Sequence, residues 1–132
     1  MAVWHKRSDR KPTGGVIKAN RKSMKYEAGS EPIKTTLGKI KTKKVKTFGG
    51  NSKLKLSSTD TANVIDKQSK SVKKAKVLDV IENKANPHFV RQKVITKGAL
   101  IKTDLGVCKV TSRPGQYGTV DAVLVEKAHE KK

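Results

Sequence analysis

Residues 105–126 read LGVCKVTSRPGQYGTVDAVLVE and carry the clearest structural signal in the chain. Apolar residues lie on both sides of the central RPGQYG, in which a Pro-Gly pair and a second glycine supply the backbone angles of a turn. The pattern predicts an antiparallel hairpin with strands at 105–112 and 119–126.

Further short segments are rich in β-branched or other apolar residues. The segments are residues 33–37, 39–48, 62–65, 77–81, 89–90, 94–95, 99–101 and 107–110. Their spacing predicts an all-β fold, a small barrel-like meander of short antiparallel strands, with loops at 57–60 and 66–71. The pattern leaves open whether the strands close into a true barrel.

The stretch 52–57 shows the most regular alternation. It places Leu54 and Leu56 on one face of a strand and Lys53 and Lys55 on the other. We therefore expect one face of this strand to be cationic.

Residues 1–32 show neither a helical nor a strand period. Pro12 and the pair Gly14-Gly15 predict extended chain with a tight turn. We expect three parts: a basic extended N-terminal tail at 1–32 that orders on its partner, a β-barrel-like body at 33–126 and a frayed tail at 127–132.

The charge of the chain points to a polyanionic partner. Its 132 residues contain 31 Lys+Arg and 11 Asp+Glu, a net charge of +20, of which +13 falls in residues 1–56. Solubility alone needs a net charge of about 2–8 for a small domain. Nucleic acid is therefore the expected ligand.

Several other classes of function are disfavoured. Cys108 is the single cysteine, which excludes an intramolecular disulfide and a thiolate zinc site, and we expect it to be a core residue. His5, His88 and His129 are expected at the surface. No catalytic motif is present, so we expect no enzyme activity, cofactor, metal or small-molecule substrate; an RNA-modifying enzyme would need clustered titrating groups. No apolar run exceeds four residues, which predicts a cytoplasmic protein without membrane contact.

Lysines outnumber arginines 26 to 5, which favours contacts with phosphates over base readout. The selected RNA-binding residues are Trp4, His5, Lys6, Arg7, Arg10, Lys11, Arg21, Lys22 and Lys25 in the tail, and Lys41, Lys43, Lys44, Lys46, Lys53 and Arg113 in the body. Among the aromatic residues, Trp4, Tyr26, Phe48 and Tyr117 can stack on unpaired bases or serve as hydrophobic anchors, and an anchor is favoured for Phe48. The glycine pairs at 14–15 and 49–50 fit either plain turns or phosphate-binding backbone.

Several sequence blocks, in order along nearly the whole chain, resemble the S8e family of small-subunit ribosomal proteins of archaea and eukaryotes. The blocks are Trp4-x-x-Arg7-Ser8-x-Arg10-Lys11-Pro12-Thr13-Gly14-Gly15, Tyr26-Glu27-x-Gly29, Thr36-x-Gly38, Gly49-Gly50-Asn51-x-Lys53, Ala85-Asn86-Pro87-His88-Phe89-Val90-Arg91, Ile95-Thr96-Lys97-Gly98-Ala99 and Val110-Thr111-Ser112-Arg113-Pro114-Gly115-Gln116. The compact length resembles the short archaeal form.

The resemblance implies a β-barrel-like body and a basic extension that threads into ribosomal RNA. It also implies a structural role in translation, with small-subunit ribosomal RNA and neighbouring small-subunit proteins as partners. Composition alone equally permits a general nucleic-acid-binding or RNA-chaperone module outside the ribosome.

Overall fold

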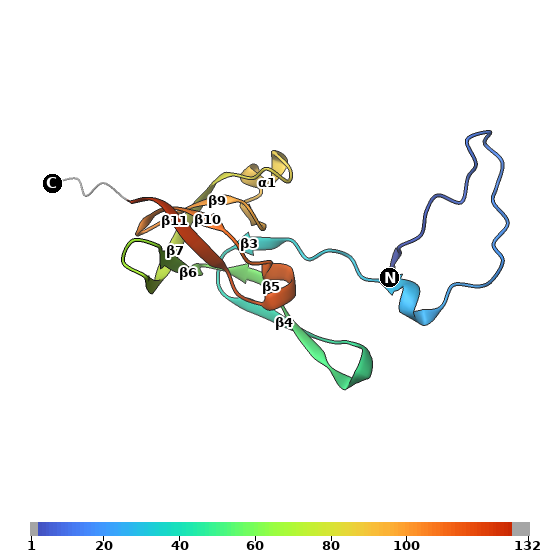
Figure 1. Ribbon diagram of the computed structural model, residues 1–132, viewed down its shortest axis with the longest axis horizontal. Helices are drawn as coiled ribbons and strands as arrows, with labels where there is room; N and C mark the ends of the chain where they lie inside the picture. Colours follow the sequence, from blue (N-terminus) through green and yellow to red (C-terminus); the bar gives the residue numbers. More distant parts are fainter. Residues whose placement is uncertain (1–2, 128–132) are drawn as a thin grey trace. The chain divides into compact units, whose positions relative to one another are not determined.

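The computed structural model describes residues 3–127, and the chain divides into two compact units between Pro32 and Ile33. The colours of Figure 1 follow the sequence, so the chain can be traced from the first unit into the second. Of the frayed tail expected at 127–132, Lys127 belongs to a strand and the remaining residues lie outside the described part.

The larger unit is built on a closed five-stranded barrel (Figure 1). Its strands, in the order in which they pair, are β10 (Gly106–Val110), β11 (Asp121–Lys127), β6 (Thr61–Asp66), β7 (Ser71–Glu82) and β9 (Leu100–Thr103). The all-β, barrel-like fold class is confirmed, and β10 and β11 form the antiparallel hairpin predicted for 105–126. However, β11 pairs with β6 in parallel, a pairing that a purely antiparallel meander does not contain.

The barrel interior is filled by small and β-branched side chains. Ile101, Cys108 and Ala122 have no exposed surface, which confirms the prediction that Cys108 is a core residue. The long strand β7 shifts register twice against β9, after Val77 and after Val80. Such bulges bend a strand, which lets its twelve residues follow the curvature of the barrel.

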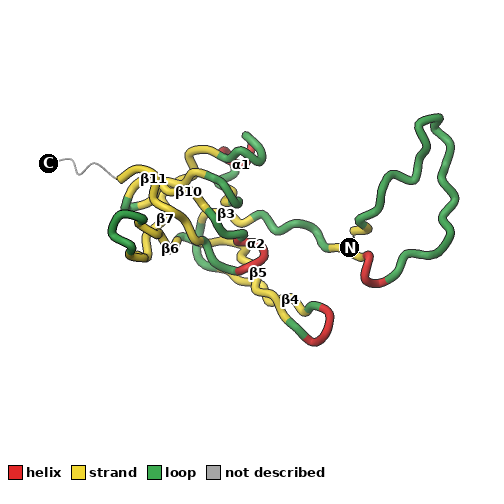
Figure 2. Tube along the Cα trace, in the orientation of Figure 1, coloured by secondary structure: helices red, strands yellow, loops and turns green. Residues whose placement is uncertain are grey.

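A second sheet contains four strands in the order β4 (Lys41–Lys46), β5 (Ser52–Thr59), β3 (Thr35–Leu37) and β8 (Val94–Ile95). Strand β5 continues to Thr59, so the loop predicted at 57–60 is wrong over most of its length. The buried hydroxyl of Thr35 donates a 2.7 Å hydrogen bond to the Leu56 carbonyl, which ties β3 to β5. Figure 2 shows the β4–β5 hairpin extending from the rest of this unit to a short helical turn, η2 (Phe48–Gly50).

The segment 89–90, predicted as a strand, is instead part of the short helix α1 (His88–Arg91). The Asn86 side-chain oxygen accepts a 2.9 Å hydrogen bond from the His88 amide, and the Phe89 amide donates to the Asn86 carbonyl. These bonds turn the chain at Asn86 and start a helix despite the β-branched valine that follows. A second short helix, α2 (Pro114–Tyr117), fills the turn between β10 and β11.

In the smaller unit the chain returns on itself. Strand β1 (Val3–Trp4) pairs with β2 (Ala28–Gly29), directly after the turn η1 (Lys25–Glu27). Within the loop that this pair closes, the Lys11 amide donates to the Gly15 carbonyl, so the tight turn predicted around Pro12 is present. The segment is therefore a closed loop, which its sequence pattern did not predict.

Candidate nucleic-acid interface

The β4–β5 hairpin concentrates positive charge on an ordered element. The stretch 33–56 contains eight lysines and no acidic residue. All five lysines selected from this stretch, Lys41, Lys43, Lys44, Lys46 and Lys53, are exposed. Because no carboxylate of the same stretch competes for them, an external anion is their natural counterpart.

Strand pairing divides these lysines between the two faces of the hairpin. Lys43 lies opposite Lys55, whereas the next pair along the ribbon, on the other face, is Lys44 opposite Leu54. Lys46 shares the face of Lys44 by alternation, and Lys53 shares the face of Lys43. Within β5 the register places Lys53 and Lys55 on one face and Leu54 and Leu56 on the other, as expected. Strand β4 also adds Lys44 and Lys46 to the leucine face, so the hairpin carries lysines on both faces.

Leu54 and Leu56 lie on the same face but in different surroundings. Leu56 is 3% exposed in the core, whereas Leu54 is 53% exposed. Lys55, which the selection omitted, directly faces Lys43, and the alternation in 52–57 was the signal for it. Directly opposed like charges weaken a strand pair.

Helix α2 brings the loop that carries Arg113 against β5. The Lys53 ammonium donates a 3.4 Å hydrogen bond to the Gln116 side chain, across 63 positions of sequence. Gly118 caps α2 with φ +75°, and a Cβ placed there would lie 2.9 Å from the Leu54 Cβ. The structure thus joins Lys53 to the loop that exposes Arg113 and Tyr117, a proximity that the sequence pattern did not predict.

The selected residues of the smaller unit are exposed along its closed loop. They are Trp4, His5, Lys6, Arg7, Arg10, Lys11, Arg21, Lys22 and Lys25. Trp4, Lys6, Arg7, Arg21 and Lys22 line a hollow of about 810 Å³ together with neighbouring loop residues. The Arg10 guanidinium instead donates to the Gly14 carbonyl at 3.1 Å, so part of its hydrogen-bonding capacity supports the turn.

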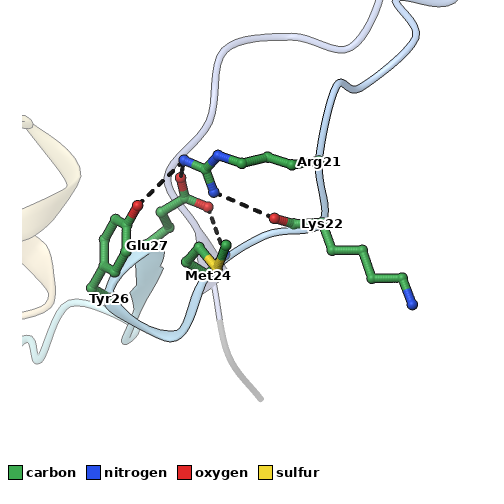
Figure 3. Close-up of polar contacts among 5 residues, drawn as sticks. All are labelled: Arg21, Lys22, Met24, Tyr26 and Glu27. Atoms are coloured by element: carbon green, nitrogen blue, oxygen red, sulfur yellow. Dashed lines mark hydrogen bonds and ion pairs between the residues drawn. The ribbon is translucent and has the colours of Figure 1, made fainter.

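Figure 3 shows how Arg21 and Glu27 fasten this loop. The Arg21 guanidinium donates to the Glu27 carboxylate at 2.7 Å and to the Tyr26 hydroxyl at 3.3 Å. The other Glu27 oxygen accepts a 2.8 Å hydrogen bond from the Met24 amide. The bond from the Met24 amide is the main cause that holds the pKa of Glu27 below its ordinary value, and the bond from Arg21 is the second.

The exposed aromatic residues differ in what surrounds them. Tyr26 contacts Arg21, and Tyr117 is 70% exposed on α2. Phe48 is 66% exposed at the tip of the hairpin, so its interpretation as a hydrophobic anchor is wrong. Gly49 and Gly50 adopt φ +73° and +74°, the left-handed region that lets the tip reverse direction.

The histidines, the cysteine and the acidic groups are the side chains that a catalytic or metal site would use. His5 and His88 are exposed as expected, and His129 lies outside the described part. Burial raises the pKa of the Cys108 thiol, which favours the unreactive protonated form. Between residues 3 and 127, no three or more His, Cys, Asp or Glu side chains are grouped to hold a metal ion. Nor does that stretch contain a helix with the length and apolar character of a membrane span.

Comparison with known proteins finds one family whose model covers all the predicted RNA-binding residues. The model of the family described as ribosomal protein S8e matches residues 4–125, a range that includes every selected residue. The small ribosomal subunit protein eS8 of Picrophilus torridus is 42% identical over 125 residues, which are 95% of this chain and 100% of that protein.

Proposed function

The chain belongs to the ribosomal protein S8e family, and from that premise we propose that it is a structural constituent of the small ribosomal subunit that binds ribosomal RNA. The β4–β5 hairpin is the observation that carries the RNA-binding part of the proposal. Its lysines are exposed, lie on an ordered ribbon and occur in a stretch without acidic residues. In this proposal the protein acts in translation by supporting RNA structure in cytoplasmic subunits, beside neighbouring subunit proteins, and not by catalysis.

The hairpin lysines neutralise RNA phosphates from both faces of the ribbon. Each ammonium placed against a phosphate releases a condensed counterion, which favours binding and makes it dependent on salt. Strand β3 holds the base of the hairpin, because it pairs with β5 and donates the Thr35 hydrogen bond to the Leu56 carbonyl, so the lysines are presented together. The Arg113 loop, held to β5 through Lys53 and Gln116, extends the same surface.

The smaller unit supplies the second set of contacts. Its closed loop, residues 5–27, carries eight Lys+Arg against two acidic residues. In the proposal the basic segment 1–32 binds RNA separately from the body, which begins at residue 33. The closed loop binds phosphates through Lys6, Arg7 and Arg10. A pre-closed loop loses less conformational entropy on binding than a free tail of the same charge.

The salt dependence of RNA binding tests the hairpin contacts. We expect Lys43→Ala/Lys53→Ala, on one face, and Lys44→Ala/Lys46→Ala, on the other, each to lower the slope of log K against log salt by about one unit per lost phosphate contact. Filter binding over a salt series with a small-subunit RNA fragment measures this slope. Lys67→Ala/Lys70→Ala, in the exposed turn between β6 and β7, removes the same charge away from the hairpin and is the control. Unchanged slopes for both hairpin variants would contradict the proposal.

Sedimentation tests the ribosomal location separately. We expect the protein to co-sediment with small subunits through a sucrose gradient at moderate salt. Protein that binds RNA in the filter assay and yet stays outside the small-subunit fraction would favour the general RNA-binding alternative.

A further inference from the structure

Hydrogen bonds close the chain on both sides of Phe48, whereas the residue itself is exposed. The Thr47 amide donates a 2.8 Å hydrogen bond to the Asn51 carbonyl, and the Asn51 side chain donates to the Phe48 carbonyl at 3.4 Å. These bonds close the tip on both sides of the ring, which nevertheless stays 66% exposed. Phenylalanine has no polar group to favour such exposure, so the ring gains stability only when something covers it.

The backbone beside the ring leaves room for a flat ligand. Gly49 and Gly50 follow directly, and both lack side chains that would stand over the turn. An added Cβ at Gly50 would meet nothing within 4 Å. A planar group can therefore approach the tip closely from the glycine side.

The charge around the ring limits what that group can be. Lys44 and Lys46 lead into the tip on β4, and Lys53 leads away from it on β5, all of them exposed. An uncharged apolar protein surface would desolvate these ammonium groups without compensation. A ligand with a flat apolar face and a flanking anionic backbone satisfies both the ring and the lysines, and an unpaired nucleotide has this chemistry.

We propose that Phe48 is a stacking platform for an unpaired nucleobase of the bound RNA, with the neighbouring lysines on its flanking phosphates. The proposal deepens the RNA-binding function given above and rests on it. The tip would then differ from the rest of the hairpin in what it binds. The lysines bind phosphates of any RNA, whereas the ring binds only a base that is not paired or stacked in an RNA helix.

Two probe RNAs of equal length and charge test the proposal with the full chain: a stem with a single-stranded loop that contains 2-aminopurine, and a blunt, fully paired duplex. Alanine substitution of a stacking residue weakens binding by about 5- to 150-fold. We expect Phe48→Ala to show a loss in this range for the loop RNA only, with the salt slope unchanged. Phe48→Tyr keeps the aromatic face and retains affinity and 2-aminopurine quenching, whereas Phe48→Leu keeps apolar bulk and loses both. Thr42→Ala, exposed on the same hairpin, is the control for folding and changes neither.

The outcomes separate the two proposals. Equal loss on both RNAs, or no loss on the loop RNA while the native chain binds it, overturns the stacking platform and leaves the RNA-binding function standing. Failure of the native chain to bind either RNA overturns the RNA-binding function itself.

Discussion

Glu27 is an acidic residue whose removal we expect to weaken a basic interface. Its carboxylate holds Arg21 and the Met24 amide, and so fixes the loop that carries seven of the thirteen lysines and arginines predicted to bind RNA. Glu27→Gln raises the net charge by one, which by charge alone would strengthen RNA binding, yet it removes the ion pair that orders the loop. We therefore expect lower RNA affinity, together with faster exchange of the Met24 amide, measured by filter binding and by hydrogen exchange.

Glu31→Gln is the matched control, because Glu31 is an exposed acid in the same unit. This variant makes the same change in charge, and we expect its RNA affinity to rise. If both variants raise the affinity, charge alone governs the loop.

The same contact has a defined pH dependence. The lowered pKa of Glu27 means that its stabilising contribution is fully present above the ordinary value of 4.5 and is lost as the pH falls through the lowered native value. The Met24 amide resonance of the native chain should follow that acid titration, and the resonance of Glu27→Gln should not.

At the scale of elements, Gly118 determines how α2 joins β5. Its positive φ costs a side-chain-bearing residue about 1–2 kcal/mol. An added Cβ would also lie 2.9 Å from the Leu54 Cβ and 3.3 Å from the Leu54 carbonyl oxygen. Gly118→Ala should therefore lower the free energy of unfolding by about 2–4 kcal/mol in urea denaturation.

Gly98→Ala separates the two causes. Gly98 has φ +86° but nothing within 4 Å of an added Cβ, so only the conformational cost applies and we expect a loss of about 1–2 kcal/mol. Equal losses for the two variants would show that Leu54 yields to the new methyl group.

The elements were predictable where neighbouring residues determine them. Alternation and β-branched residues located the strands, and a Pro-Gly turn located the β10–β11 hairpin. Helix α1 was missed because the hydrogen bond to the Asn86 side chain outweighs the strand preference of Phe89 and Val90. The parallel pairing of β11 with β6 joins segments about 58 positions apart, as Asn63 and Asp121 do, and no local pattern encodes it.

The candidate interface was predictable in composition but not in arrangement. Charge counting found the lysines of the hairpin, but only the pairing register shows that Lys43 and Lys44 lie on opposite faces and that Lys55 faces Lys43. The exposure of Phe48 likewise depends on how far the hairpin extends beyond the body. Local sequence cannot give that distance.

For the whole molecule, the core belongs entirely to one unit. Every buried hydrophobic side chain among the described residues lies between Leu56 and Ala122. A chain that lacks residues 1–32 should therefore keep the thermal unfolding midpoint of the full chain to within a few degrees, while its RNA binding becomes weaker and less dependent on salt. Circular dichroism melting and filter binding measure the two effects, and a large drop in the midpoint would show that the first unit stabilises the body.

Strand β11 is the last described strand of the chain and pairs on both sides within the barrel, which governs the order in which the chain can fold during its own synthesis. This strand lies between β10 and β6, so the barrel stays open until the last described strand has emerged. Until then the facing edges of β6 and β10 lack a partner, and the pairing that closes the barrel spans more than fifty residues. Such long-range closure is slow compared with the formation of hairpins. A nascent chain therefore displays its lysine-rich hairpin to passing polyanions before it has a finished core.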